Sequence, residues 1–165
     1  MEDMQEVLIK KNSVTVSASG ACIYSIESNA PSAEYPRSFL EVVKAWKRYV
    51  MKEGCSPSDS RFEGDGLGCA LVLATCLWCR DHGIPLPSGI VLRDPVIAPS
   101  EGADSPYFST ADVDDPCAFP LIADYYGFPS VSLEIHGNSM LKTQAESLHR
   151  RLSEQDISSE VKVIS

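Results

Sequence analysis

Helix-spaced apolar positions alternate with short apolar runs along this chain of 165 residues. Within residues 39–50, apolar side chains fall at i, i+3, i+4, i+7 and i+11, which predicts an amphipathic helix ending near Gly54. Residues 69–79 (CALVLATCLWC) are almost wholly apolar, which predicts a helix buried on nearly all sides. The runs 21–25 (ACIYS) and 89–92 (GIVL) predict buried strands.

The same alternation continues in the last third of the chain. Residues 131–135 and 161–163 alternate apolar and polar side chains, as strands do, and Ala145, Leu148 and Leu152 mark one face of a helix between them. Strands that alternate with helices favour parallel pairing, so we expect one α/β domain over residues 1–165. Residues 98–120 interrupt the pattern and are expected to form an acidic loop.

Composition and charge narrow the class of protein. The chain carries 14 Lys and Arg against 23 Asp and Glu, a net charge of −9. A nucleic-acid-binding protein needs a basic face, so we exclude that class. No apolar run approaches the roughly 20 residues of a membrane span, and the acidic residues 1–6 lack the features of a signal peptide. The six cysteines then indicate reduced thiols, and we expect a cytoplasmic protein.

A glycine-framed pentapeptide precedes the buried helix at residues 64–68 (GDGLG). A strand-to-helix turn with this framing is typical of the nucleophile elbow G-x-S-x-G, in which a tight turn exposes a serine. Gly66 stands at the serine position and has no side chain to attack with. Glycine also accepts the strained backbone of such a turn, which costs other residues about 1–3 kcal/mol.

In this context the chain resembles the hormone-sensitive-lipase-like branch of the α/β-hydrolases, most of which are carboxylesterases and lipases. The resemblance covers about residues 18–165 and rests on an ordered series of stretches: 24–27 with 35–36, 39–52, 64–69, 84–92 and 128–141. It implies a partial, mostly parallel α/β-hydrolase sheet with flanking helices. It also implies that the N-terminal strands and the C-terminal histidine segment of the family are missing.

The family's mechanism requires a serine, a carboxylate, a histidine and an oxyanion hole. The resemblance puts Gly66 at the nucleophile position and Ser139, within the turn 137–141 (GNSML), at the acid position. The family's histidine lies beyond the last strand, where we expect none in this chain, and no HGGG-type loop precedes Tyr24. No family catalytic residue is therefore expected to be intact.

Three residues remain as a candidate remnant site: Asp65, Cys69 and His136. Cys69 falls in the first turn of the buried helix, where the helix dipole lowers a thiol pKa, but a small buried core residue is the stronger interpretation. Asp65 is expected to support the turn. His136 is the histidine closest to the expected acid turn. Because no partner for it is identified, we expect Gly66→Ser alone to restore no activity.

Two features fit the family poorly. Residues 59–63 carry three charges in five, which is unexpected for a central strand of a parallel sheet. The family sheet also has a strand between those that contain Tyr24 and residues 61–63. Residues 6–10 (EVLIK) are the candidate for it, but residues 11–20 are too few for an ordinary parallel crossover.

Three functions remain open. The first is a catalytically inactive relative of carboxylic-ester hydrolases that at most binds a small molecule or a partner. The second is a carboxylesterase or lactone hydrolase that uses unconventional residues or is completed by another chain. The third is a non-hydrolytic helper in small-molecule metabolism. The missing triad favours the first, with a small apolar ester-like ligand, self-association through exposed sheet edges, and no cofactor or metal.

Overall fold

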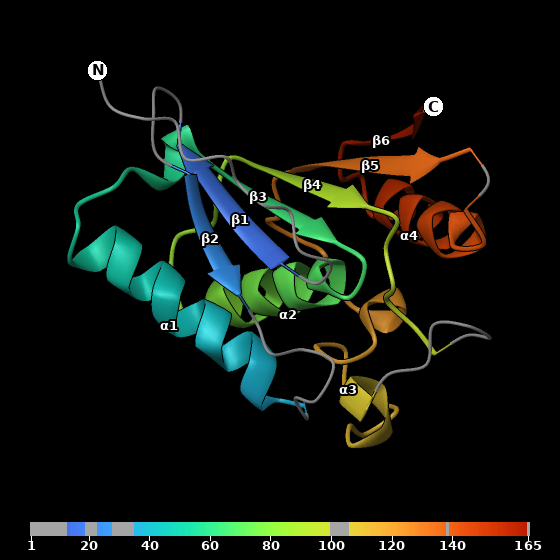
Figure 1. Cartoon of the computed structure of the whole chain (residues 1–165), viewed down its shortest axis with the longest axis horizontal. Helices are drawn as coiled ribbons and strands as arrows, with labels where there is room; N and C mark the ends of the chain where they lie inside the picture. Colours follow the sequence, from blue (N-terminus) through green and yellow to red (C-terminus); the bar gives the residue numbers. More distant parts are fainter. Residues whose placement is uncertain (1–12, 19–22, 28–34, 100–105, 138, 165) are drawn as a thin grey trace.

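Six strands form one sheet with helices against it (Figure 1). The computed structural model describes residues 13–18, 23–27, 35–99, 106–137 and 139–164, with side chains from residue 35 onward. In chain order the elements are β1 (Ser13–Ala18), β2 (Ile23–Glu27), α1 (Arg37–Met51), β3 (Ser60–Asp65), α2 (Gly68–Asp81), β4 (Gly89–Arg93), α3 (Pro106–Ser109), β5 (Ser130–His136), α4 (Lys142–Glu154) and β6 (Ser159–Ile164). Short 3₁₀ turns precede β3 (Pro57–Asp59) and follow α3 (Pro120–Ile122).

The strand order is β2-β1-β3-β4-β5-β6. The four strands from β3 to β6 pair in parallel, and β1 pairs antiparallel with both β2 and β3. The expected strand at residues 6–10 lies outside the described residues. The strand beside β3 is β1 instead, and it runs antiparallel to β3. An antiparallel β1 needs only a short connection to β2, so the brevity of residues 11–20 is no obstacle.

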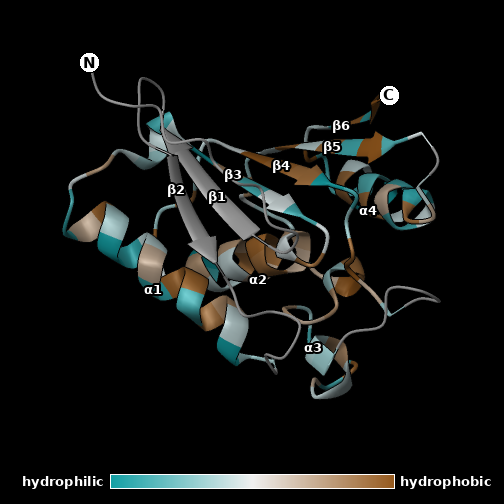
Figure 2. Ribbon diagram, in the orientation of Figure 1, coloured by the Kyte–Doolittle hydropathy of each residue, from teal (hydrophilic) through white to brown (hydrophobic). Residues whose placement is uncertain are grey.

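The hydrophobic core lies on one side of this sheet. Apolar residues of α1, α2 and α4 form a single buried cluster with those of β3, β4 and β5, so these three helices cover the same face. Between Gly68 and Cys79 only Trp78 is not buried, which confirms the expected all-round burial of this helix. Figure 2 shows α2 as one of the most hydrophobic segments of the ribbon.

The opposite face of the sheet is polar where its side chains are described, except for Val91 of β4, which is in register with Glu63 and is buried. Arg61 and Glu63 of β3 lie on it and form an ion pair of 2.6 Å, while Phe62 between them is fully buried on the core side. The expectation that residues 59–63 are unsuited to a central strand is therefore wrong. No described helix covers the outer face, so a central strand with one polar side is stable there.

Part of the segment expected as an acidic loop is helical. It contains α3, in which Tyr107 and Phe108 are buried. Tyr35, just before α1, donates its hydroxyl to Asp115 Oδ2 at 2.6 Å. This contact ties the described part of the acidic segment to the start of α1.

Candidate functional site

The turn between β3 and α2 has the backbone of an elbow. Gly66 has φ of +59°, in the left-handed region that favours glycine. Its N–H donates to the carbonyl oxygen of Arg93 at 3.0 Å, and its own carbonyl accepts from the N–H of Val96 at 3.0 Å. These two hydrogen bonds hold the turn against the segment that follows β4. One is made to Arg93, before Asp94, and the other to Val96, after it.

Gly64 lets the strand and the helix approach closely. A Cβ at this position would lie 2.8 Å from the backbone nitrogen of Cys69 and 2.8 Å from the carbonyl carbon and oxygen of Gly68. Backbone atoms of a helix cannot move aside cheaply, so the first glycine of the pentapeptide is required by packing.

Cys69 is placed as a core residue. Its side chain is fully buried, and its thiol donates to the carbonyl oxygen of Arg93 at 3.4 Å. Burial, reinforced by the charge of Asp65, raises the pKa of the Cys69 thiol well above its usual value. A thiol held protonated in the core is a poor nucleophile, although it lies at the start of α2. Asp65 ends β3 in register with Arg93.

The cysteines of α2 are likewise structural. Cys76 and Cys79 are fully buried, and burial raises the pKa of both thiols, that of Cys79 to about 12. Within the described residues, no group of three or more His, Cys, Asp and Glu side chains is arranged to hold a metal ion.

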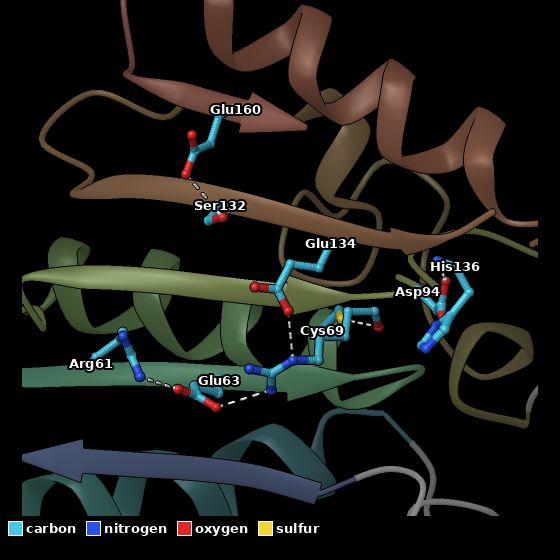
Figure 3. Close-up of polar contacts among 9 residues, drawn as sticks. Arg61, Glu63, Cys69, Asp94, Ser132, Glu134, His136 and Glu160 are labelled. Atoms are coloured by element: carbon cyan, nitrogen blue, oxygen red, sulfur yellow. Dashed lines mark hydrogen bonds and ion pairs between the residues drawn. The ribbon is translucent and has the colours of Figure 1, made fainter. Parts of the chain in front are cut away.

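His136 bonds a carboxylate that was not expected from the sequence, that of Asp94. The backbone N–H of His136 donates to Asp94 Oδ1 at 3.0 Å, and the ring Nδ1 of His136 is hydrogen-bonded to Asp94 Oδ2 (Figure 3). The hydroxyl of Ser139 accepts the backbone N–H of Leu141 at 3.1 Å. Asp94 therefore holds the histidine that lies beside the expected acid turn.

Asp94 has an unusual backbone and a shifted pKa. Its φ of +42° is uncommon for a residue other than glycine, although aspartate tolerates it better than most. Burial by itself raises the pKa of the Asp94 carboxyl, but the hydrogen bonds from His136 outweigh it and hold the pKa below its usual value. Strained residues of this kind concentrate at functional sites.

The signal that points to Asp94 is topological. Asp94 directly follows β4, and His136 ends β5, the next parallel strand. The carboxyl ends of neighbouring parallel strands share one edge of a sheet, where α/β proteins place their sites. Asp94 and His136 can therefore be paired from the positions at which their strands end. The family's motifs do not pair them.

The sequence matches no protein-family model. The chain is 26% identical over 141 residues to LipR of Mycobacterium tuberculosis, which is named as an acetyl-hydrolase; the match covers 73% of this chain and 46% of LipR. An esterase from the bacterial hormone-sensitive lipase family superposes with a TM-score of 0.75 and 24% identity, over 86% of this chain and 55% of that structure. A hormone-sensitive lipase from a metagenome library gives 0.74 and 21%, over 86% and 54%.

These matches confirm the resemblance and the fold. The chain is a partial α/β-hydrolase fold that spans about half the length of the relatives it matches. Its sheet, elbow turn and flanking helices are the part of that fold described above. Among the described residues, no helix has the length and apolar character to cross a membrane.

Proposed function

We propose that this chain is a relative of carboxylic-ester hydrolases that forms no acyl-enzyme intermediate. The observation that supports this most strongly is Gly66, which has the backbone of an elbow and offers no nucleophile. Cys69 does not replace it, because its thiol is fully buried and held protonated. In this proposal the carboxyl edge of the sheet binds a small ester-like ligand or a partner without hydrolysing it.

The test is a turnover assay with short p-nitrophenyl esters. We expect no release of p-nitrophenol above a protein-free blank, and a ligand that binds without turnover should raise the melting temperature. Activity that survives repurification and follows the protein peak would contradict the proposal.

A second function is favoured by one observation, the pairing of His136 with Asp94. An unconventional ester or lactone hydrolase would use such an imidazole to activate water directly. In that case the turnover would be lost in His136→Ala and kept in His82→Ala, which removes another exposed imidazole. Equal loss or equal retention in the two variants would reject this second function.

Self-association through exposed sheet edges, as expected from the sequence, belongs to the same proposal. The described outer face of the sheet is polar except for the buried Val91, so it is a poor hydrophobic contact surface. Among the described strands, β2 and β6 form the edges of the sheet, and their outward backbone groups are the candidate contacts.

A further inference from the structure

Asp94 fixes the orientation of His136 through two hydrogen bonds. Oδ1 accepts the backbone N–H of His136 at 3.0 Å, and Oδ2 is bonded to the ring nitrogen Nδ1. The two oxygens belong to one rigid, planar carboxylate. The hydrogen bond from the His136 backbone N–H to Oδ1 therefore also sets the direction from which Oδ2 meets Nδ1 of the ring.

The ring of His136 leans from β5 towards the elbow. Its partner Asp94 follows β4, which lies between β5 and β3. Neighbouring strands are about 5 Å apart, so β3 and β5 are separated by about 10 Å and the imidazole extends over the end of the strand between them. Gly66 is hydrogen-bonded on either side of Asp94, to Arg93 and Val96, so the elbow lies beside the pair.

The carboxylate also decides which ring nitrogen carries the proton. A neutral imidazole has one N–H and one lone pair, and a carboxylate at Nδ1 requires the N–H there. The lone pair is then on Nε2, for which no described residue is a hydrogen-bond partner. The His136 side chain is 61% exposed, so Nε2 is accessible to a ligand.

We propose that His136 is a general base at the carboxyl edge of the sheet, oriented by Asp94, that accepts a proton from a small hydroxyl-bearing ligand held beside Gly66. Asp94 is a positioning residue, and His136 is the group that touches the ligand. This inference deepens the second function above, because both rest on the pairing of His136 with Asp94. It is independent of the proposal that no acyl-enzyme forms, which concerns the missing nucleophile.

The tautomer of His136 in the unaltered chain is the first test. Long-range ¹H–¹⁵N correlation spectra of the ¹⁵N-labelled chain, at a pH where the ring is neutral, should show the proton on Nδ1. In Asp94→Asn, Oδ1 still accepts the backbone N–H of His136, which turns the amide NH₂ towards Nδ1. That nitrogen must then accept a hydrogen bond, and the proton should move to Nε2. Asparagine also tolerates the positive φ, so the variant should fold. A proton on Nε2 in the unaltered chain would overturn the proposal.

The second test places a hydroxyl at the elbow with Gly66→Ser and measures labelling by a fluorophosphonate probe. In this reaction the introduced hydroxyl oxygen forms a bond to phosphorus, the P–F bond breaks, fluoride leaves, and the hydroxyl proton passes to Nε2 of His136. We expect labelling in G66S, against the expectation from the sequence that Gly66→Ser alone restores no activity, because the base and its partner are now identified. We expect none in G66A, which carries the same backbone strain without a nucleophile. The rate should fall at least about 100-fold in G66S/H136A and in G66S/D94N.

The outcomes separate the two proposals. A folded G66S that is not labelled above G66A, or labelled equally without His136, overturns the general base and leaves the proposed function intact. Ester turnover by the unaltered chain overturns the proposed function and leaves the base to be judged by the labelling. If circular dichroism shows that G66S and G66A are both unfolded, the tautomer measurement decides.

Discussion

Two glycines of the elbow serve different physical purposes. At Gly66 the backbone conformation requires glycine, since φ is positive there. At Gly64 the reason is space, because helix backbone atoms occupy the position that a Cβ would take. The glycine that frames the turn, Gly64, and the glycine at the serine position, Gly66, therefore have separate structural reasons.

Gly64→Ala should destabilise the chain by about 2–3 kcal/mol, because the added methyl group forces β3 and α2 apart. The free energy of unfolding, measured by urea denaturation, checks this. Gly89→Ala is the matched control in the next strand, where a Cβ would have no neighbour closer than 3.9 Å, and it should change stability little. A loss of stability in G64A no larger than in G89A would show that the helix moves aside without cost.

At the level of elements, the outer face of the sheet is held together by charge. Arg93 of β4 bonds Glu63 of β3 at 3.0 Å through Nη1 and Glu134 of β5 at 2.7 Å through Nε (Figure 3). All three side chains are less than one-third exposed. Three parallel strands are thus joined by one guanidinium on a face without a described helix.

Arg93→Met should lower the free energy of unfolding by about 1–3 kcal/mol, because it leaves two partly buried carboxylates without their shared cation. Lys162→Met is the control, since Lys162 and its partner Glu160 are both more than half exposed and the loss of that pair should not be measurable. Thermal and urea unfolding of the two variants give the comparison. Equal stability of the two variants would mean that the Arg93 network contributes nothing.

The elements were largely predictable from the sequence, and the site only partly. The helical face in residues 39–50 and the apolar run 69–79 depend on local periodicity, and both became helices with nearly the expected ends. Strand β3 was harder to recognise, because its charged side chains form ion pairs on a face of the sheet that no described helix covers. Hydrophobic periodicity alone does not reveal such pairs. Asp94 was missed because its partner His136 is 42 residues away and the two meet only through strand order.

At the scale of the whole molecule, the two open edges of the sheet differ. The outer strand β6 carries Glu160 and Lys162, and charged side chains on an edge discourage pairing with another chain. The other outer strand, β2 (IYSIE), has a single charge. Association of copies of the chain is therefore expected through β2.

Amide hydrogen exchange at low and high protein concentration tests this expectation. Protection of residues 23–27 should rise with concentration as their open edge is paired, while that of residues 159–164 should stay constant. Sedimentation at the same concentrations shows whether the chain associates. An associated chain with new protection at residues 159–164 alone would place the contact on β6 instead.

The arrangement of helices on one side has a consequence for any ligand. Doubly wound sheets open a crevice where the strand order reverses and successive helices pass to opposite faces. From β3 to β6 the chain adds every strand in one direction, so this part of the sheet opens no such crevice. Any enclosure of a molecule at the carboxyl edge of this part must therefore come from the segments that follow the strands, not from a crevice in the sheet.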